Sequence, residues 1–346
     1  MVTTLEKPPA EHYKPSGRAK FPPGMMGKVA GHMIKNRLKG QRFPTVLQLE
    51  PLHTCNFHCS GCGRIREYES TIHEQLTLEQ CLDAVDQSDV PVVSIAGGEP
   101  LIYRHIVPLV EELQRRDKYM YLCTNGWILD RKIDEFKPDR HLIVNLHLDG
   151  MEETHDAIVE WPGAFKKAIE GIKLLKDRGF HACINTTIYK QTRNDEIVEL
   201  FKLVESLGID GILVSPAYSY KEVDPEFYQT RAEIQGRFRE LAPRLRGFKL
   251  WNTPIYFRYL MGEIDLDCTP WGTPTANPRG WRGPCYQLGD THHGSFSEMM
   301  KSTDWQRYIK HEDERCSACM THGGYEPSAA LKALSFKGAI EVLRGW

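Results

Sequence analysis

Residues 45–62 read TVLQLEPLHTCNFHCSGC, an apolar strand-like run that leads directly into three closely spaced cysteines. Cys55, Cys59 and Cys62 have the spacing Cys-x3-Cys-x2-Cys. Three thiolates can hold three irons of a 4Fe–4S cubane and leave the fourth iron open, whereas a cluster that only carries electrons normally has four cysteines. A structural zinc site also needs four ligands, and His58 could supply the fourth. The triad predicts a 4Fe–4S cluster with an open iron, with a zinc site as the alternative.

Apolar runs alternate with helical patterns from residue 45 to residue 220. Strand–helix alternation indicates a parallel sheet with right-handed crossovers. The predicted fold class is therefore α/β, a partial (βα)6 TIM-type barrel. The expected strands are Thr45–Pro51, Val90–Ala96, Lys118–Thr124, His141–Asp149, Phe180–Ile188 and Gly211–Ser215. The expected helices between them are Leu78–Ser88, Ile106–Asp117, Lys132–Phe136, Ala164–Arg178 and Glu196–Leu207.

The alternation does not extend to the two ends of the chain. At the N-terminal end, a Pro- and Lys-rich arm precedes an expected basic amphipathic helix at 24–40. Beyond residue 220, expected helices at 224–244, 295–310 and Ala329–Leu343 flank a Pro- and Gly-rich stretch, 268–290. We expect three parts: an N-terminal arm and helix (1–40), the partial barrel (41–220) and a C-terminal cysteine-containing extension (221–346).

Polar side chains recur at every second position of three expected strands. Alternate residues of a strand point to the same face, and buried parallel strands are usually apolar on both faces. A polar face therefore predicts a functional cavity, near the C-terminal strand ends where barrels gather their catalytic groups. The three sets are Tyr121, Cys123 and Asn125; Asn145, His147 and Asp149; and His181, Cys183, Asn185 and Thr187.

Composition narrows the class of protein. The 346 residues carry a formal net charge of −2, which gives no indication of a nucleic-acid partner. No apolar run approaches the roughly 18–20 residues that span a bilayer, and residues 1–20 lack the apolar centre of a signal peptide. We therefore expect a cytoplasmic protein. Ten cysteines in that compartment favour metal binding or redox chemistry over disulfides.

A second motif follows the second expected strand, where Gly97, Gly98, Glu99 and Pro100 form the sequence GGEP. The cysteine triad after one strand and GGEP after the next resemble the radical S-adenosylmethionine (SAM) superfamily. This resemblance implies that the open iron binds SAM and that the GGEP backbone and Glu99 receive the methionine amino group. An ordinary glycine turn and hydrogen-bonded core polar groups are the alternatives. The resemblance also suggests further SAM-cavity residues, namely Asn125, Asn145, His147, Asn185 and Ser215.

The resemblance extends to a narrower family, because seven segments together resemble the adenosylhopane synthase (HpnH) family. They are LEPLHTCNFHCSGCGRI, PVVSIAGGEPLI, YLCTNGWIL, HLDG, DGILVSPAYSY, CTPWGTPTANPRGWRGPCYQLG and CSACMTHGGYEPSAA. Two features depart from it: the arm at 1–23 is extra, and the family's HCGYE reads HGGYE at 322–326.

Membership would imply a radical SAM adenosyltransferase of hopanoid biosynthesis. The 5′-deoxyadenosyl radical adds to the exocyclic alkene of the hopene diploptene, a triterpene lipid, and yields adenosylhopane. A low-potential donor such as flavodoxin or ferredoxin would supply the electron. The alternatives are a radical SAM enzyme that adenosylates, or abstracts hydrogen from, a different substrate, and a non-enzymatic iron–sulfur carrier or zinc-binding module.

The remaining cysteines suggest two further roles. The radical left on the alkene must be quenched, and Cys123 is the candidate hydrogen-atom donor because it shares the polar face of its strand. The alternative is a small buried hydrophobe, a frequent role of free cysteine. Cys268, Cys285, Cys316 and Cys319 supply enough ligands for a second metal site, with unligated thiols as the alternative.

The expected N-terminal helix suggests peripheral contact with the inner face of a membrane. Its apolar residues recur on one side with basic residues beside them, as in helices that lie in a membrane interface. The alternative is a helix that only packs on the barrel, and the C-terminal segment LKALSFKGAIEVLRGW, 331–346, is a rival candidate for the same contact. The residues are Met25, Met26, Val29, Met33, Ile34 and Leu38, with Lys28, Lys35, Arg37 and Lys39.

Overall fold

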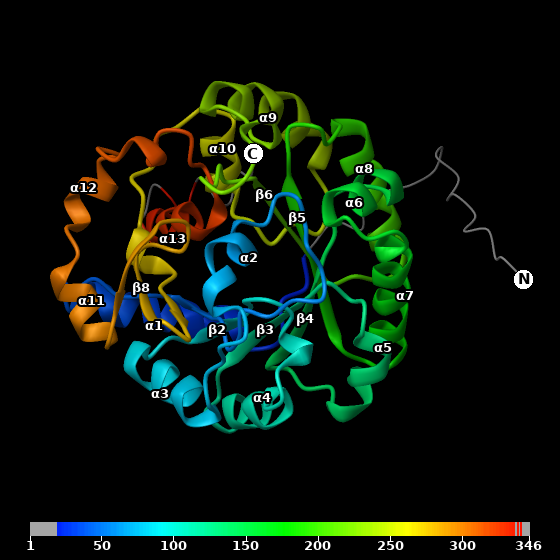
Figure 1. Ribbon diagram of the computed structural model, residues 1–346. Helices are drawn as coiled ribbons and strands as arrows, with labels where there is room; N and C mark the ends of the chain where they lie inside the picture. Colours follow the sequence, from blue (N-terminus) through cyan, green and yellow to red (C-terminus); the bar gives the residue numbers. More distant parts are fainter. Residues whose placement is uncertain (1–18, 336–337, 339, 341–346) are drawn as a thin grey trace, which may run out of the picture.

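The computed structural model describes residues 19–335, 338 and 340 of the chain. All of its named strands belong to one curved nine-stranded sheet with the order β6-β5-β4-β3-β2-β1-β7-β8-β9 (Figure 1). The first six strands are parallel and confirm the predicted partial barrel. They are β1 (Val46–Leu49), β2 (Val92–Ile95), β3 (Tyr119–Thr124), β4 (Leu142–His147), β5 (His181–Ile188) and β6 (Gly211–Pro216).

Most of the barrel helices cover the outer face of the strands, whereas α2 lies over the centre of the barrel (Figure 1). The sequence determines their ends locally. Thr77 and Gln80 form a capping box that starts α3 where it was predicted, and Gly179 adopts a positive φ of 79° just after α7. The barrel helices are α2 (Gly63–Glu67), α3 (Leu78–Ser88), α4 (Ile106–Arg115), α5 (Leu129–Lys132), α6 (Glu152–Val159), α7 (Ala164–Asp177) and α8 (Asn194–Ser206).

The C-terminal extension joins the barrel through the sheet. The Pro- and Gly-rich stretch 268–290 contains β7 (Thr275–Asn277), β8 (Gly280–Pro284) and the first residues of β9 (Gly289–His293), which the alternation did not indicate. β7 pairs in parallel with β1, and β8 and β9 follow as antiparallel strands. The helices of this part are α9 (Arg231–Leu245), α10 (Pro254–Leu260), α11 (Phe296–Ser302), α12 (Trp305–Ile309) and α13 (His322–Ala333).

The start of α13 corrects a prediction. The expected helix Ala329–Leu343 begins after Pro327, but α13 begins at His322 and contains this proline. Proline removes the hydrogen bond to the carbonyl four residues earlier, here that of Gly323. The Thr273 hydroxyl donates to this carbonyl at 2.7 Å, so the helix tolerates the proline. Most of the expected helix beyond residue 335 lies outside the described residues.

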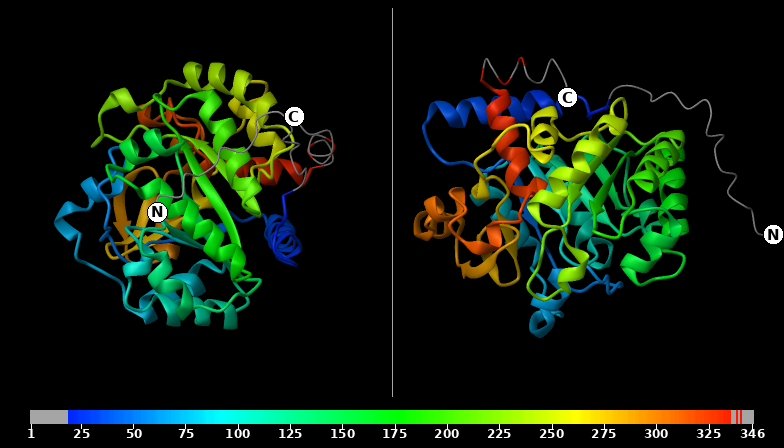
Figure 2. Two further views of the ribbon diagram at one scale, coloured as in Figure 1. Left: turned by 90° about the vertical axis from the view of Figure 1, so that its right-hand side faces the viewer. Right: turned by 90° about the horizontal axis from the view of Figure 1, so that it is seen from above.

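The N-terminal helix α1 (Met25–Leu38) lies at the end of the barrel opposite the cysteine loop, as the left view of Figure 2 shows. Its Met25 packs with Val92 and Tyr119, the first residues of β2 and β3, and with Trp251. The Tyr119 hydroxyl also bonds to the carbonyl of Pro23 just before the helix. The described helix α1 therefore closes the N-terminal end of the strands.

Candidate active site

The cysteine loop, residues 55–62, follows β1 and ends at α2. Cys55, Cys59 and Cys62 all line one cavity of about 540 Å³ inside the barrel. The Phe57 amide donates to the Cys55 sulfur at 3.4 Å. The Phe57 ring stacks on Trp161 with a centroid separation of 5.2 Å, so aromatic packing shields one side of the loop from water.

The three thiols would repel one another as bare thiolates. Burial, followed by the neighbouring charges, raises the pKa of Cys55 to about 12 and raises the pKa of Cys59 as well. Cys62 contributes to both shifts, which shows that the sulfurs lie near one another. Metal coordination deprotonates such thiols outright. The site therefore fits a cationic iron–sulfur cluster, which Cys55, Cys59 and Cys62 would hold.

Two kinds of metal site were predicted for the triad. A cubane carries its thiolates on separate irons, whereas a zinc ion would need the triad and His58 around one centre. Within residues 19–335, 338 and 340, no three His, Cys, Asp or Glu side chains are grouped to hold a single metal ion.

The GGEP loop touches the chain that leads into the cysteine loop. A Cβ on Gly98 would lie 1.8 Å from the Thr54 carbonyl oxygen, and one on Gly97 would lie 2.4 Å from that of Leu52. The Gly98 amide donates to the Leu52 carbonyl at 3.1 Å, and the Glu99 amide donates to that of Thr54 at 2.9 Å. Glycine is thus required here, and the two motifs are held together by their backbones.

The Glu99 carboxylate is buried and serves the loop after β3. It accepts hydrogen bonds from the Leu101 amide (3.0 Å), the Thr124 hydroxyl (2.8 Å) and the Asn125 amide (2.9 Å). Burial raises the pKa of Glu99 to about 7, because it outweighs these three hydrogen bonds. Two carboxylate oxygens offer about four acceptor positions, so one position remains for a further donor such as an ammonium group.

The predicted polar face of the strands does line the cavity. Asn125, named with the SAM residues, also holds the Asn56 side chain of the cysteine loop at 2.7 Å. His181, Cys183 and Asp149 share the strand parity but are not among the lining residues. The predicted residues that line the cavity are Gly97, Gly98, Glu99, Tyr121, Cys123, Asn125, Asn145, His147, Asn185, Thr187 and Ser215.

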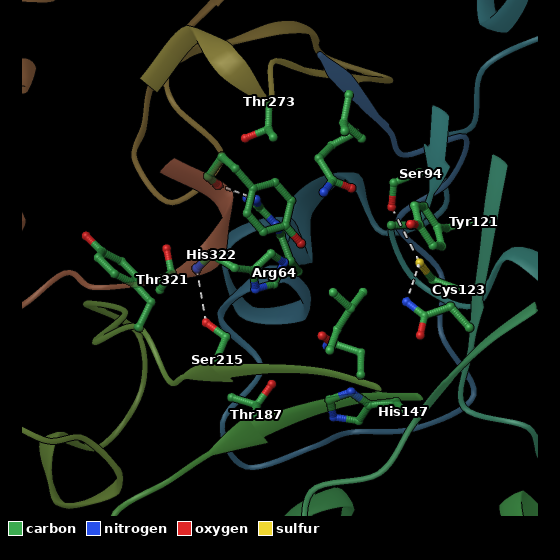
Figure 3. A pocket seen from close by; sticks show the side chains of 18 of the residues that line it. Arg64, Ser94, Tyr121, Cys123, His147, Thr187, Ser215, Thr273, Thr321 and His322 are labelled. Atoms are coloured by element: carbon green, nitrogen blue, oxygen red, sulfur yellow. Dashed lines mark hydrogen bonds between the residues drawn. The ribbon is translucent and has the colours of Figure 1, made fainter. Parts of the chain in front are cut away.

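Cys123 occupies a polar corner of the cavity. Figure 3 shows its sulfur beside Ser94, whose hydroxyl lies 3.5 Å away. The Asn145 amide donates to the same sulfur at 3.6 Å, and its carbonyl accepts from Cys183 at 3.2 Å. Burial raises the pKa of Cys123, so the group remains a thiol with its S–H bond intact.

His147 is held by a buried carboxylate behind it. Its Nε2 lies 2.5 Å from Asp149 Oδ2, and the other oxygen of Asp149 accepts from the Thr187 amide at 2.7 Å. Burial lowers the pKa of His147, but the charge of Asp149 more than offsets this and the net shift is upward. Asp149, predicted from parity to share the cavity face, instead orients the histidine from outside the cavity.

Two charged residues that line the cavity, Arg64 and Glu326, were not predicted from the sequence. Arg64, two residues after Cys62, lines the cavity and pairs with buried Glu50 at 3.1 Å. Glu326 also lines the cavity and accepts from Asn252 at 2.9 Å, and burial raises its pKa to about 7. A sequence signal existed for Glu50, the partner of Arg64: Gln48 and Glu50 are polar residues at alternate positions of β1 and the residue after it, the same pattern that identified the polar faces of the other strands. No such signal marks Glu326, which lies in a helix.

The four C-terminal cysteines come from three segments that the fold brings together. Thr269, next to Cys268, donates its amide to the Gly324 carbonyl. The side chain of Gln287 bonds to the Thr321 hydroxyl at 3.3 Å, and that hydroxyl lies 3.6 Å from Cys319. The charges of Cys285, Cys316 and Cys319 all act on Cys268. The thiols therefore gather beside the cavity, although none lines it.

Comparisons with known proteins agree with this arrangement. The radical SAM superfamily model matches residues 49–204, and a domain of unknown function, DUF3463, matches residues 212–341. The pre-heme d1 synthase of Dinoroseobacter shibae is 27% identical over 46% of this chain and 40% of its own length. The AdoMet-dependent heme synthase of Methanosarcina barkeri is 29% identical over 48% of each chain. The chain thus spans about half the length of these curated relatives.

Solved structures share the fold. Streptococcus suis SuiB aligns with a TM-score of 0.62 at 15% identity, over 81% of this chain and 69% of its own. The enzyme anSMEcpe, with bound AdoMet and a Cp18Cys peptide, aligns with a TM-score of 0.57 at 17% identity, over 87% and 96%. The cysteine triad and the adjoining GGEP loop both lie within residues 49–204, so the part of the chain that the radical SAM superfamily model matches carries a radical SAM domain, which uses a 4Fe–4S cluster and SAM.

Proposed function

We propose that this radical SAM enzyme adds the 5′-deoxyadenosyl group of SAM to the exocyclic alkene of a hopene such as diploptene and forms adenosylhopane. The observation that carries the proposal is a cavity with two unlike halves. Its mouth holds the cysteine triad, Glu99 and the Cys123 thiol, whereas its far end is lined mainly by apolar side chains of α1 and of the first residues of β1 and β2. The resemblance of the motifs to adenosylhopane synthases supplies the identity of the alkene.

The apolar half suits a triterpene. Val46 and Val92 begin their strands and line the cavity near α1, together with Trp251. Burying apolar surface yields about 25 cal/mol per Å², so a hydrocarbon skeleton gains far more in this half than at the polar mouth. Binding the skeleton there would direct one end of it toward the cysteine triad and Cys123.

The chain's own residues have distinct tasks in the reaction. When bound, the cluster and SAM would supply the 5′-deoxyadenosyl radical. Its addition to the unhindered alkene carbon would leave a tertiary carbon radical. Cys123 donates a hydrogen atom to that radical, because its S–H bond is the weaker one. Ser94 and Asn145 hold the sulfur in place. A low-potential donor, such as flavodoxin or ferredoxin, supplies one electron for the cleavage of SAM. A second electron from it, with one proton, restores the thiol.

The decisive experiment is anaerobic reconstitution with SAM, reductant and diploptene, followed by mass analysis of the lipid. We expect an adduct that contains the adenosyl group. Release of 5′-deoxyadenosine with an altered lipid would instead show hydrogen abstraction, the alternative within the superfamily. Unchanged diploptene despite SAM cleavage would rule out this substrate and leave a different one.

We also propose that Cys268, Cys285, Cys316 and Cys319 hold a second iron–sulfur cluster. Backbone support resembles that of the triad, since the Leu288 amide donates to the Cys285 sulfur at 3.4 Å. A positive charge that could offset the negative charge of the thiolates lies nearby, because the Arg231 guanidinium donates to the Cys319 carbonyl at 3.1 Å. The charges of Cys285, Cys316 and Cys319 also act on Cys268, so all four thiols are near enough to share one centre.

A further inference from the structure

The helix α1 carries most of the exposed apolar surface made by large side chains. The described residues include four exposed large hydrophobic side chains, and three of them belong to α1. These are Met26, Ile34 and Leu38, exposed by 54%, 50% and 83%, and the fourth is Ile102. Spacings of eight and four residues place the three on one side of the helix, where they form a continuous stripe rather than scattered single residues.

The adjoining face of α1 forms a wall of the cavity. Met25 and Met33 are buried, and both line the apolar half together with Val29. Met26 belongs to both sets, because it lines the cavity and is half exposed. Met26 therefore connects the cavity wall with the exposed stripe on the same helix, at the end of the barrel where α1 lies.

The surroundings of the stripe are basic. Residues 19–44 contain six lysines and arginines and no acidic residue, although the whole chain has a net charge of −2. Lys28 is neutralised by Asp117, but Lys35 and Lys39 are exposed and form no ion pair with any described residue. An apolar stripe flanked by unpaired lysines matches the interface of an anionic bilayer, where lipid headgroups attract cations and acyl chains accept apolar side chains.

We infer that α1 docks on an anionic phospholipid bilayer and covers the port through which the lipid substrate enters the cavity. The inference rests on the proposed function, since it requires an apolar substrate. SAM and the substrate must occupy one cavity together, and SAM fills the polar mouth. An entrance at the opposite, apolar end lets the hydrocarbon pass from the membrane to the reaction site without crossing water or displacing SAM.

Docking is tested by flotation of the cluster-loaded full chain with vesicles of phosphatidylglycerol and phosphatidylcholine. We expect the wild-type protein to float with these vesicles and much less with pure phosphatidylcholine. The double variant Ile34→Glu/Leu38→Glu should bind at least tenfold more weakly, whereas Ile102→Glu, the matched exposed control on another element, should float normally. Equal binding of the double variant and the wild type, or equal losses in both variants, would overturn docking through α1.

The port is tested separately with Met26→Trp. This variant keeps an apolar side chain on the stripe, and tryptophan is favoured at membrane interfaces, so flotation should be at least as strong as that of the wild type, but the larger ring narrows the opening. Adduct formation from vesicle-borne diploptene should then fall several-fold. Unchanged adduct formation would overturn the port. If the wild type forms no adduct at all, the proposed substrate is wrong, while flotation still decides whether α1 binds the membrane.

Discussion

Two groups of cysteines differ in how the chain assembles them. Cys55, Cys59 and Cys62 come from one eight-residue loop, whereas Cys268, Cys285 and the pair Cys316–Cys319 come from three segments that only the fold unites. A triad leaves one iron open for SAM, and four ligands would close a cluster. The comparison suggests that the number of cysteine ligands decides the role of a cluster. Three thiolates leave one iron free to bind SAM for catalysis, whereas four thiolates would hold a closed cluster.

The largest expected effect concerns the triad. Replacing any one of Cys55, Cys59 or Cys62 with alanine should abolish SAM cleavage and the 4Fe–4S absorption of this site, because three ligands are the minimum. Cys81→Ala is the matched control: this thiol is buried next to Tyr103 and away from both cysteine groups, so cleavage should persist. Persistent SAM cleavage in a triple variant would contradict the assignment of the open cluster.

Glu99→Gln should affect SAM but neither cysteine group. A charge-assisted hydrogen bond contributes about 1.5–3 kcal/mol, so we expect SAM to bind roughly ten- to a hundredfold more weakly with the iron content unchanged. The NH₂ group of the new glutamine would also face one of the three hydrogen-bond donors that now donate to the Glu99 carboxylate. SAM affinity measured by equilibrium dialysis provides the check, and unchanged affinity would remove Glu99 from the site.

The same residue predicts a pH dependence. Burial raises the pKa of Glu99 to about 7, so the carboxyl is protonated below this value and charged above it. Only the charged form attracts an ammonium group fully, and SAM affinity should therefore rise by roughly tenfold between pH 6 and pH 8. The amide introduced by Glu99→Gln does not titrate, so this variant should lack the rise; an equal rise in both proteins would assign it to another group.

Cys123 belongs to neither group of cysteines, and its replacement tests the proposed role of its thiol as hydrogen-atom donor. Cys123→Ala should keep the cluster, bind SAM and add the adenosyl group, but saturated adduct should fall and unsaturated adduct should rise, because the carbon radical lacks its donor. A merely structural role would cost about 1 kcal/mol of stability and leave the products unchanged. Cys123→Ser keeps the volume, but its O–H bond is too strong to give up hydrogen. Normal saturated product from this variant would exclude Cys123 as donor, as liquid chromatography with mass detection will show.

The smallest expected effect concerns the second group of cysteines and is measured as the number of iron atoms per chain. Two clusters predict about eight irons per reconstituted chain, and one cluster predicts about four. The variant Cys316→Ala/Cys319→Ala should lose iron at the second group while the triad retains its spectrum. About four irons and no zinc in the wild-type protein would show that the C-terminal thiols are unligated.

Local patterns were sufficient for the barrel strands. Apolar runs predicted each of these strands to within a few residues, and strand parity predicted that Cys123, Asn145 and His147 line the cavity. Parity could not separate Asp149, because the chain leaves β4 before reaching it. The start of α13 and the position of Glu326 depend on Thr273 and Asn252, partners distant in sequence. Contacts between residues so far apart in the sequence produce no repeating pattern of apolar and polar residues from which they could be predicted.

The pairing of β1 with β7 has a consequence for how the chain folds. The amide of Thr45, just before β1, bonds to the carbonyl of Gly272, 227 residues further along. During synthesis the first strand of the barrel must therefore wait, with one edge unpaired, until most of the chain has left the ribosome. An unpaired edge recruits other strands, and contacts so far apart in sequence form slowly. A protein shortened after β6 would keep that edge permanently, so we expect it to aggregate rather than persist as a free-standing barrel.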